Sequence, residues 1–299
     1  MNLRTADLRH VEATHLHRFD NRNFNSEFNT DIQNTVIIFT RIIMSLRSII
    51  QQKRSEDIID IIGKDLYVEF RKGDNISLPQ PIVTSIQQLN KINPILTTAF
   101  LNTLIDINIC YSQRKPCECF KFETLSDNQK KFIKEVTNKS AQHFSELMKQ
   151  LSSSIAKNNL KNMSRDSLIT GIVISSILYY NNLDIGAQVS SNNVKKFIEA
   201  AKQMNMSLFD NTVSAIFKNN KLEITNQRVK TQDLYTGFVG KNFVMDIICA
   251  KTLPTVSVLY GLLLKAKLNG KYSVICINLY TMKIHSIVLT PQLIAKVKF

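Results

Sequence analysis

Residues that form turns are scarce in this chain, which has only 8 Gly and 6 Pro among its 299 residues. An all-β domain needs a turn signal about every 8 to 12 residues, and this composition does not supply them. Apolar residues make up 44% of the chain, enough to bury a substantial core. The sequence therefore predicts a mainly α fold of long helices.

Apolar periodicity locates those helices. Ile32, Val36, Phe39 and Ile43 begin a stripe with alternating steps of four and three residues, typical of one helix face, and the stripe continues to Ile50. Similar patterns, together with Pro and capping residues at the starts, predict further helices. We expect helices at 31–50, 56–62, 81–91, 94–109, 127–156 with a break near Asn138, 165–181, 191–204, 207–218, 241–250 and from Pro254 to about residue 267.

Two segments have β character instead. Leu66, Val68 and Phe70 alternate with polar residues before a turn at 72–75, which indicates an edge strand. Residues 271–280 and 282–289 are rich in β-branched residues and predict a hairpin. The expected fold is mainly α, with two helical lobes, a minor β element near 65–71 and a C-terminal β-hairpin near 272–289.

Composition divides the chain into three parts. Residues 1–30 form a polar arm whose isolated Phe side chains could dock on a neighbouring subunit. Residues 31–125 form a neutral N-terminal helical lobe, and residues 126–299 form a basic C-terminal lobe. The boundary is placed in the stretch 111–125, which has no helical period and coincides with a shift in charge.

The net charge of +14 arises entirely in the second part of the chain. Residues 1–110 carry 12 Lys or Arg and 12 Asp or Glu, whereas residues 111–299 carry 26 and 12. Such an excess attracts polyanions and makes copies of the protein repel one another. We therefore expect a polyanionic partner.

Clusters of basic residues near helix ends are the candidate nucleic-acid-binding residues. Lysines in the first turns of a helix oppose its dipole, and an external anion would explain their presence. The predicted residues are Lys130, Lys131, Lys134, Lys195, Lys196, Lys202, Lys218, Lys221, Arg228, Lys230, Lys265, Lys267 and Lys271.

The chemistry of these clusters favours contacts to phosphates over the reading of bases. Lys greatly outnumbers Arg here, and an ammonium is a point charge, whereas a guanidinium can bind a base edge in bidentate fashion. Nearby aromatic side chains could stack on bases, although most of them are expected in the core. The candidates are Phe132, Phe197, Phe217, Tyr235, Phe238, Tyr272 and Tyr280.

No catalytic signature is present, so we expect a protein that is not an enzyme and has no cofactor. The chain lacks Gly-x-Ser-x-Gly, the phosphate-binding loop and the dinucleotide fingerprint. Cys110, Cys117 and Cys119 lack the second pair that a structural zinc site requires, which favours ordinary thiols in a partly exposed connector. Cys249 and Cys276 lie in apolar segments and are expected to be buried. We predict no metal site.

The leading hypothesis is a sequence-nonspecific single-stranded RNA-binding protein that coats a viral genome in the manner of a nucleoprotein. RNA is favoured over DNA, and self-association through the arm is expected. One alternative is a virion matrix or scaffold protein whose basic face meets an anionic membrane or an acidic partner. Another is an accessory factor of a replication or transcription complex. We expect a cytoplasmic or virion location, because the sequence shows neither a secretory signal nor a transmembrane segment.

Overall fold

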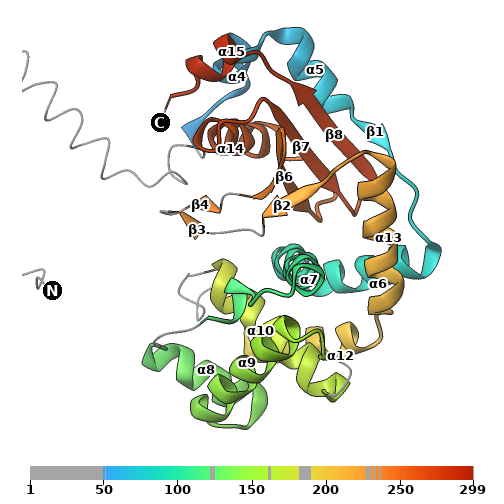
Figure 1. Ribbon diagram of the computed structural model, residues 1–299, viewed down its shortest axis with the longest axis vertical. Coiled ribbons are helices and arrows are strands. Elements are labelled where there is room, and N and C mark those ends of the chain that lie inside the picture. Colours follow the sequence, from blue (N-terminus) through green and yellow to red (C-terminus); the bar gives the residue numbers. More distant parts are fainter. Residues whose placement is uncertain are drawn as a thin grey trace, which may run out of the picture. The chain divides into compact units, whose positions relative to one another are not determined.

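The structure is a computed structural model that describes residues 50, 52–121, 125–160, 163–181, 190–226, 230–231, 234–235 and 237–298. All of them belong to one compact unit, Leu46–Phe299, shown in Figure 1. The predicted arm at 1–30 and nearly all of the helix predicted at 31–50 lie outside the described residues.

A layer of helices forms one side of this unit. Polar caps set several helix starts: Asn93 accepts a hydrogen bond from the Leu96 amide, and Ser126 and Gln129 form the predicted capping box. Asn138 ends one helix in the left-handed conformation, with φ 57°, so the break predicted there is confirmed. The layer contains α6 (Gln80–Ile92), α7 (Pro94–Gln113), η1 (Glu118–Phe120), α8 (Asp127–Thr137), α9 (Ala141–Ala156), α10 (Arg165–Asn181), α12 (Ser191–Lys202) and α13 (Met206–Asn219).

A mixed six-stranded sheet forms the other side, with the strand order β1-β8-β7-β6-β5-β2. Strands β6 and β7 are parallel and are connected through α14 (Thr255–Leu268), whereas the remaining neighbours in this sheet are antiparallel. A separate pair joins β3 (Lys230–Thr231) to β4 (Leu234–Tyr235). The six strands are β1 (Asp74–Asn75), β2 (Ile224–Asn226), β5 (Phe238–Gly240), β6 (Phe243–Ile248), β7 (Ser273–Asn278) and β8 (Lys283–Val288).

Each face of the sheet contributes to a different core. Met245 and Ile247 of β6 and Ile275 and Ile277 of β7 face the helical layer and share its core with α7. The alternate side chains, Val244, Val274 and Ile287 among them, pack against a second group of helices, because successive residues of a strand point to opposite faces. That group comprises α4 (Ser55–Ile62), α5 (Lys64–Lys72), α14 (Thr255–Leu268) and α15 (Pro291–Lys296).

Helix α7 joins the two layers. It contacts α6, α9, α10 and α13 as well as β6, and most of its side chains are buried. Asn102 of α7 donates a hydrogen bond to the Ile247 carbonyl at 2.8 Å, and the Thr98 hydroxyl accepts one from the Cys249 amide at 3.0 Å. These polar contacts fix the position of α7 against the end of β6.

The predicted fold class, mainly α with minor β, is confirmed, as is the C-terminal hairpin formed by β7 and β8. The strand predicted at 66–70 is wrong, because this segment is helix α5, and the β residues of this region are Asp74 and Asn75. Leu66 and Phe70 stand four residues apart, so the same two apolar residues fit one helix face as well as one strand face. The helix predicted at 241–250 is also wrong. That apolar segment is β6, which is covered on both faces.

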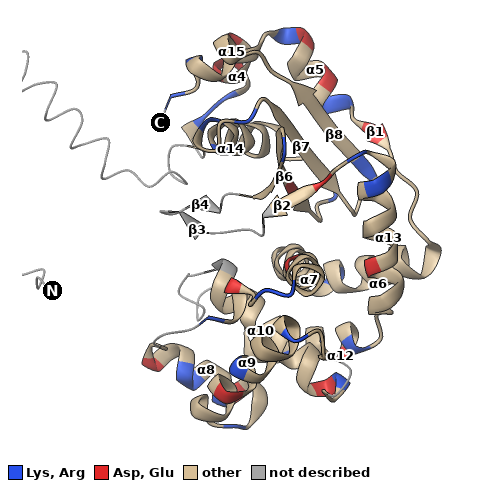
Figure 2. Ribbon diagram, viewed as in Figure 1, with Lys and Arg blue, Asp and Glu red and all other residues tan. Residues whose placement is uncertain are grey.

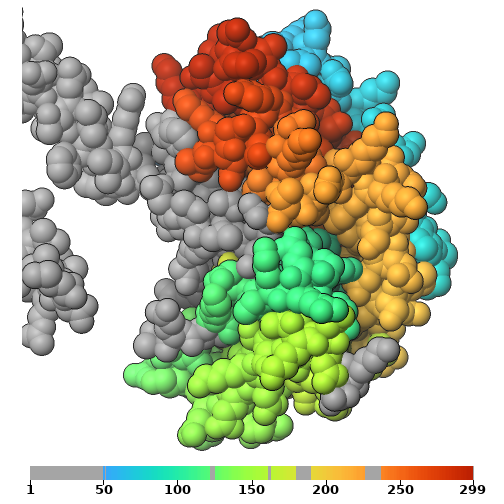
Figure 3. All heavy atoms as spheres, in the orientation of Figure 1, coloured from blue at the N-terminus to red at the C-terminus, as the bar shows by residue number. Residues whose placement is uncertain are grey.

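The boundary predicted near residue 125 falls inside the compact unit. Segments from the predicted N-terminal lobe, α4, α5 and β1, pack with strands and helices from the end of the chain. Figure 3 shows the first described segments, in blue and cyan, beside the orange and red C-terminal segments. The sheet and the helices on its other face are therefore built from early and late parts of the sequence, whereas the helical layer comes from the stretch between them, residues 80–219.

Candidate anion-binding sites

The structure separates the predicted basic residues into exposed and internally bonded groups. Seven of the predicted lysines are exposed, and these seven lie on or just after helices of the helical layer: Lys130, Lys131 and Lys134 on α8, Lys195 and Lys196 on α12, and Lys218 and Lys221 at the end of α13. Of these, Lys130 forms an exposed ion pair with Asp127 at 2.9 Å. Figure 2 shows Lys and Arg in blue along these helices.

The three predicted lysines of the sheet layer make internal contacts instead. Lys265 is buried, at 5% exposure, and its ammonium forms an ion pair with Asp246. Lys267 donates to the Val297 carbonyl, and Lys271 donates to the Lys241 carbonyl at 2.9 Å. Because these ammonium groups already bond to the protein, we leave the three residues out of the candidate sites.

Two further predicted residues cannot be placed as side chains. Arg228 lies outside the described residues, and Lys230 lies in β3 with its side chain outside the described part.

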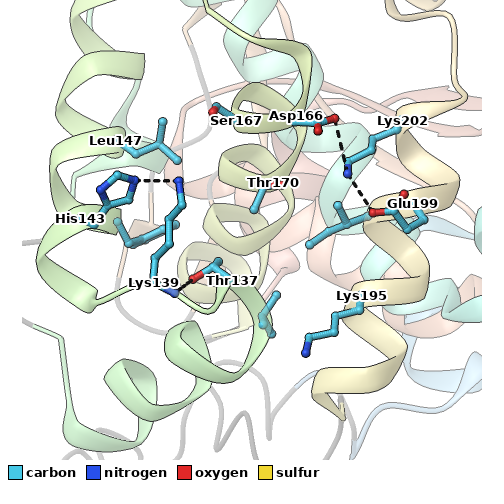
Figure 4. A pocket seen from close by; sticks show the side chains of 13 residues that line it. Thr137, Lys139, His143, Leu147, Asp166, Ser167, Thr170, Lys195, Glu199 and Lys202 are labelled. Atoms are coloured by element: carbon cyan, nitrogen blue, oxygen red, sulfur yellow. Dashed lines mark hydrogen bonds and ion pairs between the residues drawn. The ribbon is translucent and has the colours of Figure 1, made fainter.

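A first cavity, which we call the four-helix pocket, has a volume of about 280 Å³ and lies among α8, α9, α10 and α12. Lys195, Glu199 and Lys202 share one face of α12, since they are spaced by four and three residues. Lys139 and His143 reach it from the α8–α9 connection and from α9, and Asp166 comes from α10. Figure 4 shows these side chains around the pocket.

The charges in the four-helix pocket are partly paired. Lys202 contacts Glu199 at 2.8 Å and Asp166 at 3.4 Å, and Glu199 is the main cause of its raised pKa. The Lys139 ammonium lies 3.0 Å from Nε2 of His143, and the Lys139 amide donates to the Thr137 hydroxyl. Lys195 is exposed, and no ion pair of its ammonium occurs within the described ranges. Lys139 and Lys195 are thus the cations placed to meet an external anion.

Sequence reasoning missed Lys139 and His143. The sequence feature that could have identified them is the turn between two helices. Asn138 ends α8, and Ser140 caps α9 by accepting a hydrogen bond from the His143 amide at 3.2 Å. This turn carries Lys139 and is followed by His143, and both residues line the pocket. Lys130 and Lys134 lie on the same face of α8 as Thr137, a pocket residue, whereas Lys131 and Lys196 lie on other faces of their helices.

A second cavity of about 570 Å³ lies between α7, α13 and β2, and we call it the α7–α13 cavity. Lys218 and Lys221 line it together with Phe217, the one predicted stacking residue found there. Phe132, Phe197 and Phe238 are buried, as expected for most of the aromatic group, whereas Tyr272 is exposed and Tyr280 is half-buried. Tyr235 lies in β4 and its side chain is outside the described part.

The cysteines form a buried cluster, so the expectation of a partly exposed connector is wrong. Cys110, Cys117 and Cys119 form no disulfide and have 1% exposure or less, and the Cys117 and Cys119 sulfurs lie 2.7 Å apart. A hydrogen bond with Cys117, together with burial, raises the pKa of the Cys110 thiol, and burial raises those of Cys117 and Cys119. Such thiols are poor nucleophiles, because the thiolate is the reactive form.

Cys249 and Cys276 are buried, as predicted. Burial raises the pKa of Cys249 to about 12 and raises that of Cys276 as well. Within the part of the chain that the structure describes, no group of three or more His, Cys, Asp or Glu side chains is arranged to hold a metal ion.

One described helix, α7, is long and apolar enough to cross a membrane by length and composition. Inside this fold, however, 67% of its apolar window is buried against other elements. No protein-family model, curated protein or solved structure matches the chain. The functional argument therefore depends on the geometry of the sites.

Proposed function

We propose that this protein binds single-stranded RNA without reading its sequence and coats the polymer in the manner of a viral nucleoprotein. The observation that carries the proposal is the distribution of lysines. Lys139, Lys195, Lys218 and Lys221 are exposed and line two cavities of the helical layer, whereas Lys265, Lys267 and Lys271 bond to the protein itself.

The residue types support phosphate binding over base recognition. The exposed cations of the two sites are lysines, and each ammonium can contact a phosphate from many directions. Contacts to phosphates position a protein on nucleic acid but carry no sequence information. Two separate sites on one unit also favour a polymeric ligand, because the second contact becomes intramolecular once the first has formed.

A charge-neutralising triple variant tests this proposal at the four-helix pocket. Lys134, Lys139 and Lys195 are exposed, so Lys134→Gln, Lys139→Gln and Lys195→Gln together should leave the fold intact. For single strands, the slope of log K against log salt concentration is about −0.7 per phosphate contact. If each lysine binds one phosphate, the triple variant should flatten the slope by about 2 units in filter-binding titrations with an RNA of mixed sequence.

The matched control neutralises lysines of the same exposure elsewhere. Lys64 on α5, Lys91 on α6 and Lys251 after β6 are exposed and line neither cavity, so Lys64→Gln, Lys91→Gln and Lys251→Gln together should change the slope little. If both variants flatten the salt slope equally, RNA binding depends on the net charge of the protein and not on the lysines of the four-helix pocket. That result would contradict a site at this pocket. No binding of the wild-type protein to RNA would refute the proposed function.

Vesicle flotation distinguishes an RNA coat from the alternative, a matrix protein that binds an anionic membrane. Vesicles with and without anionic lipid are floated with the protein, in the presence and absence of RNA. An RNA coat should leave the vesicles when RNA is added, whereas a matrix protein should stay bound. Purification as a defined complex with another protein, without rings or filaments on RNA, would favour an accessory factor.

A further inference from the structure

The α7–α13 cavity combines an apolar interior with a basic mouth. Its apolar lining includes Ile105 and Ile109 of α7, Val213 and Phe217 of α13, and Leu222 and Ile224 at β2. Its volume of about 570 Å³ is within the range of small-molecule sites. Phe217 is half-buried and lines the cavity, so it is the aromatic residue placed to meet a ligand there.

Polar groups stand among these apolar walls. Asn108, Ser112 and Ser214 line the cavity, and the Ser112 hydroxyl donates a hydrogen bond to the Ile109 carbonyl at 2.8 Å. Asn108 also forms a hydrogen bond with Asp210, and burial of that carboxyl raises its pKa to about 6. An aromatic face beside amide and hydroxyl groups can accept a flat heterocycle that carries donors and acceptors at its edge.

The mouth carries positive charge in a fixed turn. Lys218 and Lys221 are both exposed, and Glu223 is the acid that lines the same cavity. The Leu222 amide donates to the Phe217 carbonyl at 2.8 Å, and the Lys221 amide donates to the Lys218 carbonyl at 3.1 Å. Lys221 itself has φ 55°, a left-handed conformation that follows the end of α13 at Asn219. The backbone of this turn thus places Lys218 and Lys221 at the same cavity as Phe217.

We propose that the α7–α13 cavity receives one base of a bound single strand, with Phe217 stacking on the base and Lys218 and Lys221 contacting the phosphates beside it. This inference rests on the proposed RNA binding and assigns the base contact to one site. It predicts tolerance of every base, because stacking uses the face of the ring that all bases share.

The test compares two oligonucleotides of equal length and charge, oligouridylate and the same backbone with abasic positions. Phe217→Leu removes the aromatic ring but keeps an apolar side chain. Loss of one stacked base should weaken oligouridylate binding by about 5- to 150-fold, without changing the slope against salt. The same variant should bind the abasic strand as the wild type does, and Phe217→Tyr should retain the wild-type affinity for both.

A second pair of measurements locates the contact. Lys218→Gln with Lys221→Gln should flatten the salt slope by about 1.4 units for both strands. Photocrosslinking with 5-iodouridine oligonucleotides, followed by peptide mass spectrometry, should label Phe217 in the wild-type protein.

The outcomes distinguish this inference from the function on which it rests. If the wild-type protein binds neither strand, the proposed RNA-binding function itself is refuted. RNA binding that depends on lysines but responds equally to Phe217→Leu with both strands, or crosslinks only elsewhere, would overturn the base pocket alone. Should Phe217→Leu fail to fold, as judged by circular dichroism, the crosslinked position decides.

Discussion

Asp210 is a residue at which burial shifts the pKa of a side chain. It lies on α13 and bonds to Asn108, and burial raises the pKa of its carboxyl from 3.8 to about 6, although the hydrogen bond opposes this shift. The folded protein therefore binds this proton more tightly than the unfolded chain does. Its contribution to stability is favourable at low pH and is lost as the pH rises through about 6.

Asp210→Asn should accordingly stabilise the protein at pH 8 and have little effect near pH 3.5. The amide keeps the shape of the carboxyl without its buried charge, and the shift corresponds to about 1 to 3 kcal/mol of unfolding free energy. Urea denaturation of both proteins at several pH values measures the difference. A difference that is independent of pH would show that the Asp210 carboxyl does not titrate with folding.

At the scale of elements, the unit β6–α14–β7 contains an ion pair in its core. Asp246 of β6 and Lys265 of α14 pair there, with side-chain exposures of 16% and 7%. Gly237 stands against this pair, and a Cβ at that position would approach the Met245 carbonyl to 2.8 Å and an Asp246 oxygen to 3.0 Å. A buried pair gains its Coulomb energy only after both charges lose their water, so its net contribution is small, but a single partner left alone is costly.

Lys265→Met should lower the unfolding free energy by about 3 to 5 kcal/mol, because Asp246 would remain as an unpaired buried carboxylate. The double variant Lys265→Met with Asp246→Leu should recover most of that loss, since it removes both desolvation costs. Urea denaturation gives the two values. Equal destabilisation of the single and double variants would contradict this account of the pair.

At the scale of the whole molecule, charge and assembly are linked. A net charge of +14 makes free copies repel one another, and a polyanion would remove that repulsion. The arm at residues 1–30 has four basic and four acidic residues, so it is neutral. We keep the proposal that it docks on a neighbouring copy along the RNA.

Deletion of residues 1–30 should therefore shrink RNA-bound assemblies without changing the salt dependence of binding per protein. Loss of the arm removes a contact between copies but no net charge. Electron micrographs and light scattering of the complexes measure their size, and filter binding gives the slope. Assemblies of unchanged size would refute the role of the arm, and a changed slope would indicate that it binds RNA directly.

Most helices could be predicted from the sequence, because caps and apolar stripes are local signals. The start of α8 at its capping box and the turn at Asn138 are examples. The segments α5 and β6 were misassigned because a short apolar pattern fits both a helix and a strand, and only the neighbouring elements decide between them. The four-helix pocket was half predicted: Lys195 and Lys202 were among the candidates, whereas Lys139 and His143 were not.

The sequence by itself determined the helical character of the chain, the hairpin at its end and the segregation of positive charge. These properties follow from composition and from contacts between residues close in the chain. Only the tertiary structure decided which lysines face solvent, since Lys195 and Lys265 both lie on helices yet one is exposed and the other is buried against Asp246. It also brought Phe217 beside α7 to line a cavity, because burial and cavities arise from segments that are distant in sequence.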